Sequence, residues 1–218
     1  MRAGILALTV GALALAASAG AQDVWIGPQF AFPVPARDVG DHELGVGTGV
    51  TVTLMNDSHI GFGVDLLYHY WPASPAYKAA FDRYLKSTRF ETIDSETWAL
   101  SAFQATVHMK LVAPLSGRFS PWAQVGGGLY RLDRHLEKAS REGVYAWVGG
   151  MDDLDTGVGP GWYGSVGFDY RACSDVAIGL DVNYHDVFSR YEGSSWSVDK
   201  HVPGFSAFTV GTHVLFGW

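Results

Sequence analysis

Nine ionisable residues are the part of this sequence best equipped for chemistry. Each falls on the more polar side of a segment in which apolar and polar residues alternate. Carboxylates, imidazoles and cations gathered on one side could line a polar conduit or form a proton-sensitive gate. Alternatively, they could form ion pairs with one another and fill the interior without a transport or gating role. The set is Asp65, His69, His108, Lys110, Asp169, Arg171, Asp181, His185 and His213.

The spacing of these residues specifies no standard site. No two of the histidines stand at a metal-ligand spacing within one alternating segment, so no metal site is predicted. The stretch from Asp153 to Gly157 contains two aspartates but lacks the full calcium-loop pattern and its distal glutamate. No G-x-S-x-G motif occurs. The sequence therefore predicts no catalytic residue, no metal and no cofactor.

The segments that carry the nine residues alternate with period two, which is the pattern of β-strands with two different faces. In the strand 44–55, for example, Leu44, Val46 and Val50 alternate with glycines and threonines. Long connections follow the first, third, fifth and seventh strands, and short turns follow the second, fourth and sixth. We expect a short amphipathic helix within 74–88 and a helical turn near 133–142. The predicted strands are 24–32, 44–55, 59–70, 97–112, 119–130, 161–171, 176–185 and 205–218.

The alternation predicts an all-β fold, an eight-stranded antiparallel up-and-down transmembrane β-barrel with four long external loops and three short periplasmic turns. Charged residues make up 17% of the chain, below the roughly 25% of soluble domains. The polar face is rich in Gly, Ser and Thr, which suits a crowded interior, and the apolar face suits lipid. Aromatic residues gather at both ends of the predicted strands, as interfacial girdles do. A soluble barrel would place the apolar face inside.

The first residues predict export. Arg2 precedes a short apolar run that ends in small residues, which is typical of a signal peptide cleaved after about Ala21. The expected domains are therefore the leader, 1–21, and the barrel, 22–218. The single cysteine, Cys173, has no partner for an intramolecular disulfide. A net charge of −7 without a dominant basic patch argues against nucleic acid as a partner.

The last strand carries a second set of marked residues. Its apolar face ends in an aromatic residue at the C-terminus, and we expect this face to act as an assembly signal. The strand from Ser120 to Gly128 and the ending Phe216-Gly217-Trp218 resemble those of small eight-stranded bacterial outer-membrane proteins, the OmpA-barrel, OmpW and opacity-protein group. The signal residues are Phe208, Val210, Val214, Phe216 and Trp218.

The resemblance implies the outer membrane of a Gram-negative bacterium, a monomer, and three partners: outer-membrane lipids, lipopolysaccharide and the barrel-assembly machinery. It implies a structural or surface-interaction role with a polar, largely closed lumen. One alternative is a narrow OmpW-like channel for small or hydrophobic solutes. Another is a lipid-modifying enzyme, since outer-membrane lipid A deacylases use a His, a Ser and an acidic residue. His185, Asp186 and Ser189 supply those types, without the expected spacing.

Overall fold

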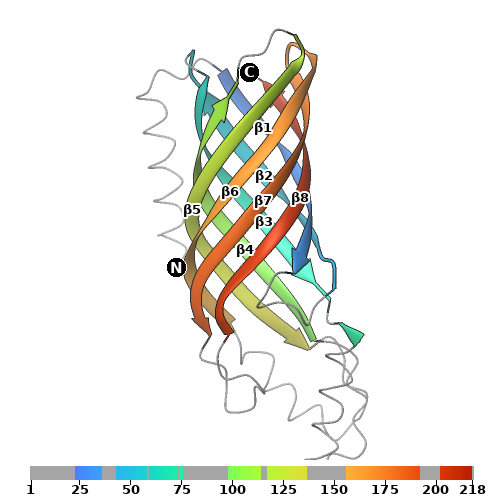
Figure 1. The fold of residues 1–218 in the computed structure, drawn as a ribbon, viewed down its shortest axis with the longest axis vertical. Helices are drawn as coiled ribbons and strands as arrows, with labels where there is room; N and C mark the ends of the chain where they lie inside the picture. The colour runs from blue at the N-terminus through green and yellow to red at the C-terminus, as the bar shows by residue number, and fades with distance from the viewer. Residues whose placement is uncertain are drawn as a thin grey trace, which may run out of the picture.

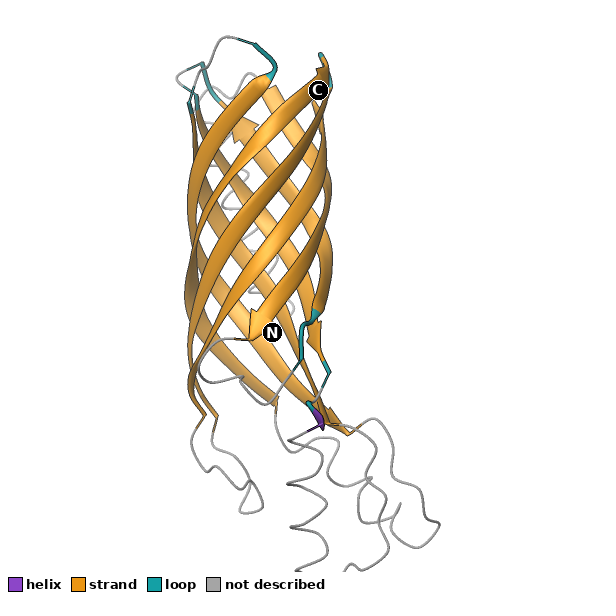
Figure 2. Ribbon diagram, turned by 45° about the vertical axis from the view of Figure 1, so that its right-hand side comes forward, coloured by secondary structure: helices purple, strands orange, loops and turns teal. Residues whose placement is uncertain are grey.

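The described part of the chain forms one closed β-barrel. The computed structural model describes residues 23–35, 43–57, 59–72, 74–75, 98–113, 117–136, 156–191 and 202–217. Within them, eight tilted antiparallel strands follow one another around the barrel in chain order (Figures 1 and 2). The strands are β1 Asp23–Pro35, β2 Val46–Met55, β3 Ile60–Trp71, β4 Trp98–Val112, β5 Phe119–Leu136, β6 Thr156–Cys173, β7 Val176–Tyr191 and β8 Val202–Gly217.

The first and last strands close the barrel by pairing with each other. Trp25 lies opposite Gly217, Phe30 opposite Thr212, and the pairing continues toward the other end of both strands. Closure leaves no unpaired sheet edge, which is the condition for crossing a membrane with strands. The predicted all-β barrel of eight antiparallel up-and-down strands is confirmed, including the closing role of the C-terminal strand.

The two faces of the sheet differ as the alternation predicts. Outward residues such as Phe30 and Val166 are 50% and 61% exposed, whereas the inward Asp65 is 2% exposed. An outer surface that bare of polar side chains would be unstable in water but matches a hydrocarbon environment. The prediction that the apolar face lies outside is confirmed.

Several predicted strand ends are wrong. Residues 131–159 were expected to form one loop with a helical turn, but β5 continues to Leu136 and β6 begins at Thr156. Likewise β7 extends to Tyr191, β8 begins at Val202, and β2 begins only at Val46. The added residues pair in register with their neighbours, as Asp133 does with Thr156, so ladder hydrogen bonds override the polar composition.

Some predictions lie outside the described residues. They are the leader 1–21, most of the helix within 74–88, the aspartates at 153 and 155, and Trp218. Among the residues that the structure describes, no helix is long and apolar enough to cross a membrane.

Candidate functional site

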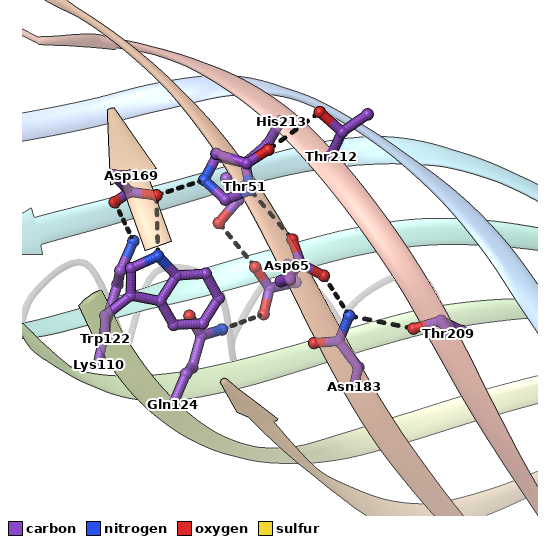
Figure 3. A network of polar contacts seen from close by, with 12 residues as sticks. Thr51, Asp65, Lys110, Trp122, Gln124, Asp169, Asn183, Thr209, Thr212 and His213 are labelled. Atoms are coloured by element: carbon purple, nitrogen blue, oxygen red, sulfur yellow. Dashed lines mark hydrogen bonds and ion pairs between the residues drawn. The ribbon is translucent and has the colours of Figure 1, made fainter. Parts of the chain in front are cut away.

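The centre of the barrel interior is organised around the carboxylate of Asp65 on β3. It accepts hydrogen bonds from Thr51 Oγ1 on β2 at 2.7 Å and from Gln124 Nε2 on β5 at 3.4 Å. His108 Nδ1 on β4 lies 2.8 Å from Asp65 Oδ2, and the Tyr163 hydroxyl on β6 donates to the same oxygen. One buried carboxylate thus joins five strands, including strands that are not neighbours in the sheet. Figure 3 shows two of these contacts, from Thr51 and Gln124 to Asp65.

His108 also extends this group of bonds toward Thr53. Its Nε2 lies 3.0 Å from Thr53 Oγ1, so a hydroxyl, an imidazole and a carboxylate follow one another in the order of a hydrolase triad. Geometry alone does not make a nucleophile, because the attacking oxygen must reach a substrate carbonyl. Thr53 is 3% exposed and His108 is 4% exposed. In this arrangement each of the three buried polar side chains has a hydrogen-bond partner.

A second carboxylate, Asp169 on β6, organises the interior nearer the short-turn end. It accepts from Lys110 Nζ at 2.9 Å and from Trp122 Nε1 at 2.8 Å. His213 Nε2 lies 2.8 Å from Asp169 Oδ1, and its Nδ1 lies 3.1 Å from Asp181 Oδ2 (Figure 3). Lys110 Nζ also sits 4.3 Å from the centroid of the Trp122 ring. Every donor here faces an acceptor, as buried charges require.

Glycines leave the space that these side chains fill. A Cβ added at Gly179 would lie 2.5 Å from Asp169 Oδ1 and would also overlap the imidazole of His213. One added at Gly126 would overlap the Tyr163 ring, with Cζ of that ring only 2.7 Å away. Large polar side chains on some strands thus require glycine, which has no side chain, on the strands that they face.

Eight of the nine predicted ionisable residues divide into three places, and Arg171 lies apart from them. Asp65 and His108 belong to the first group of bonds, and Lys110, Asp169, Asp181 and His213 to the second. The remaining two histidines lie beyond Asp65, away from the short turns.

These two histidines lie close together. Their ring centroids are 5.7 Å apart. His185 lies 3.3 Å from both the Tyr130 hydroxyl and Thr209 Oγ1, and His69 Nε2 lies 3.4 Å from Gln104 Oε1. Arg171 is different: it is exposed at the barrel mouth and belongs to neither group of bonds. It lines the same cavity as Lys110 and Asp169, at the rim that β6 reaches at this position.

Sequence reasoning missed the uncharged partners, Thr51, Gln124, Trp122 and Tyr163. All four lie on the inward side of predicted strands, so period two alone would have placed them beside the ionisable set. It also missed an apolar group inside the barrel, because part of it was assigned to loops. That group consists of Trp71, Leu100, Ala102, Tyr130, Leu132, Val187 and Ala207.

Of the C-terminal signal residues, three are exposed on the outer face of β8. They are Phe208, Val210 and Phe216. Val214 is partly exposed on the same side, and Trp218 lies outside the described residues. In the described ranges, no group of three or more histidine, cysteine, aspartate or glutamate side chains could hold a metal ion.

Two cavities show how differently the interior is filled. The one between the two carboxylate groups has a volume of about 30 Å³. The one at the short-turn end has a volume of about 410 Å³ and opens outward between the turns. We call the larger cavity the vestibule; its walls include Trp25, His59 and Arg171, and Lys110 and Asp169 lie at its inner end.

Comparison with known proteins agrees with this architecture. The model of the outer membrane protein beta-barrel domain family matches residues 4–213. The chain belongs to this family. Membership places the protein in the outer membrane and makes it an outer-membrane β-barrel protein. No curated protein sequence matches the chain.

Solved structures of this family's architecture are similar in fold. The outer membrane protein OprG from Pseudomonas aeruginosa is 14% identical, with a TM-score of 0.52 over 90% of this chain and 95% of that one. Neisserial surface protein A is 9% identical, with a TM-score of 0.48 over 89% and 94% of the two chains. Outer membrane protein W of E. coli is 15% identical, with a TM-score of 0.37 over 87% and 96%. At these identities the likeness concerns the fold alone.

Proposed function

We propose that this family member is a closed-lumen barrel that acts through its outer surface and external loops, in a structural or surface-interaction role. The observation that carries the proposal is the content of the barrel centre. Asp65 binds side chains from four other strands, and the cavity beside it measures about 30 Å³. That volume holds about two water molecules, too few for a continuous aqueous path.

The charges in the interior also favour a filling role over a conduit. A conduit needs charged groups that can exchange their partners with passing solutes. Here Lys110 is ion-paired with Asp169, and His213 lies between Asp169 and Asp181. Breaking such buried pairs costs several kcal/mol, on the order of 3–5. Barrels of eight strands are also just wide enough for side chains to fill.

We propose further that the protein is not an enzyme. The hydroxyl, imidazole and carboxylate of Thr53, His108 and Asp65 are buried inside the barrel, with no room for a lipid or peptide carbonyl beside them. His185, considered for lipid modification, is buried against Tyr130 and Thr209 and does not face lipid. Mass spectrometry of lipid A from cells with and without the gene tests this. A lipid A species that depends on His185 would contradict it.

Single-channel recording in planar bilayers tests the closed lumen. We expect no unit conductance from the wild-type barrel. A variant that carries both Trp122→Ala and Tyr163→Ala should conduct, because it removes two aromatic side chains from the filled centre. Tyr170→Ala, which removes an exposed aromatic from the outer face, is the matched control and should stay silent. Wild-type unit conductance would instead support an OmpW-like channel.

Export, assembly and partners are part of the proposal. We expect a mature chain that begins near Gln22, which mass spectrometry of the purified protein can check. The apolar outer face of β8 should engage the barrel-assembly machinery, and the outer surface should contact membrane lipids and lipopolysaccharide as a monomer. Deleting Trp218 should reduce the folded protein in outer-membrane fractions more than Lys78→Ala, a change between β3 and β4. Equal amounts of folded protein would contradict the assembly signal.

A further inference from the structure

We propose that the vestibule is a binding site for a small carboxylate ligand, a free amino acid or the C-terminal end of a short peptide, held by Arg171 against Trp25. The vestibule measures about 410 Å³, within the roughly 300–1,000 Å³ of small-molecule sites. It lies at the end of the barrel that carries the short turns and the end of β8 (Figure 1). In an outer-membrane barrel that end faces the periplasm. The proposal goes beyond the closed lumen and does not depend on it.

The cation that would bind the ligand has no carboxylate partner within the part of the chain that the structure describes. Arg171 forms no ion pair with any carboxylate among the described residues, although Asp23, Asp57 and Asp169 line the same vestibule. Asp169 is already bound by Lys110, Trp122 and His213 and is not available to a further cation. A guanidinium in this state offers two parallel N–H groups to a carboxylate from outside.

The position of Arg171 is fixed by two features. Its guanidinium carbon lies 5.7 Å from the centroid of the Trp25 ring, within cation–π distance. The pairing of β6 with β7 shifts register between Arg171 and Cys173, and such bulges turn a side chain away from its regular direction. The backbone N–H of Arg171 donates to the Arg118 carbonyl at 2.8 Å, so the bulged segment remains tied to the β5 side. An exposed arginine is thereby held at the wall of a cavity.

The opposite wall contains an unusual backbone. His59 has a φ of 61°, in the left-handed region that costs energy for residues other than glycine. Its N–H donates to the Asn56 carbonyl at 3.1 Å, and its own carbonyl accepts from Val112 at 2.9 Å. The imidazole lines the vestibule, across the barrel mouth from β6. A bulge and a strained turn thus direct side chains into the same cavity.

The charges of the vestibule select among anions. Three aspartates line it, so a dianion such as a phosphate monoester would meet more repulsion than a monocarboxylate. A ligand that also carries an ammonium group would gain from Asp23, which lines the same vestibule. These conditions describe an amino acid or a peptide C-terminus, with its carboxylate on Arg171 and an adjoining apolar group against the indole of Trp25.

Titration calorimetry of the full barrel in lipid nanodiscs tests the proposal, with alanyl-alanine as the probe. We expect saturable binding of alanyl-alanine, and at least tenfold weaker binding of its C-terminal amide and of phosphoserine. Arg171→Gln should weaken binding about 10- to 100-fold, as loss of charge-assisted hydrogen bonds does. Arg171→Lys should recover part of the loss. Arg118→Gln, an exposed arginine at the same end outside the vestibule, is the matched control and should bind as wild type does.

Heat-dependent gel mobility establishes that each variant is folded before titration. Three results would overturn the proposal: no saturable heat with alanyl-alanine, equal binding of the amide and the acid, or an equal loss in Arg118→Gln. If phosphoserine bound more tightly than alanyl-alanine, a phosphate site would replace the carboxylate site. Conductance recordings on the same samples keep this question separate from closure of the lumen.

Discussion

The centre of this barrel and its mouth at the short-turn end are enclosed by the same eight strands but are filled differently. At the centre, Asp65 accepts from several side chains, and about 30 Å³ is left beside it. At the mouth, about 410 Å³ is open, and the guanidinium of Arg171 lies against the Trp25 ring with no ion pair to a carboxylate among the described residues. Backbone geometry does not distinguish the two regions, because strand number sets the barrel width throughout.

The difference comes from which inward side chains meet and how completely they bind one another. At the centre, large side chains such as Tyr163 project over glycines on facing strands, so donors and acceptors cross the lumen. At the mouth, the strands end in turns and the inward side chains reach solvent. The proposed closure of the lumen rests on polar side chains that bind one another, and the proposed ligand site rests on a cation that binds no carboxylate among the described residues.

The largest expected effect is removal of the central acceptor. Asp65→Ala leaves the buried donors Thr51, Tyr163 and Gln124 without their carboxylate. We expect the free energy of unfolding to fall by about 3–5 kcal/mol. Urea unfolding in lipid vesicles, followed by tryptophan fluorescence, measures it. Asp175→Ala, on the exposed turn between β6 and β7, is the control and should leave stability unchanged. A loss as small as that of the control would mean that the centre is no more tightly bound than the mouth.

A smaller effect is expected where a glycine makes room for the second carboxylate group. Gly179→Ala places a Cβ against Asp169 and His213, and should cost roughly 1–3 kcal/mol of unfolding free energy. Gly164→Ala on the outer face is the matched control for Gly179→Ala, because the nearest atom to its added Cβ would be a Trp162 ring atom at 3.6 Å. The same urea series measures both. Equal free energies of unfolding for Gly179→Ala and Gly164→Ala would show that the interior side chains move to accommodate an added methyl group.

The smallest effect on stability should come from the mouth. Arg171→Gln removes an exposed cation from the Trp25 ring, a contact that is worth about 0.5–1 kcal/mol at such sites. The midpoint of urea unfolding should therefore move little, although alanyl-alanine binding should fall strongly. A stability loss as large as that of Asp65→Ala would show that Arg171 is part of the structural plug and would remove the contrast between the two regions.

How far sequence reasoning reached is clearest in β5. From Phe119 to Tyr130 its alternation was predictable, because period two is fixed by the strand backbone itself. From Arg131 to Leu136 it was missed, since charged residues there resemble a loop and only pairing with β4 and β6 holds them in the sheet. Local composition cannot report a partner that is distant in the chain.

The candidate site shows the same division. The sequence determined that Asp65, His108 and Asp169 point inward, because successive residues of a strand point to opposite faces of the sheet. It also determined the outward apolar surface and, through eight such segments, the barrel. Only the tertiary structure decided that Asp65 binds Tyr163, that Asp169 binds Lys110, and that Arg171 stands apart beside Trp25. Those pairings depend on strand register and on a bulge, and both are set by hydrogen bonds between strands that no residue pattern within one strand encodes.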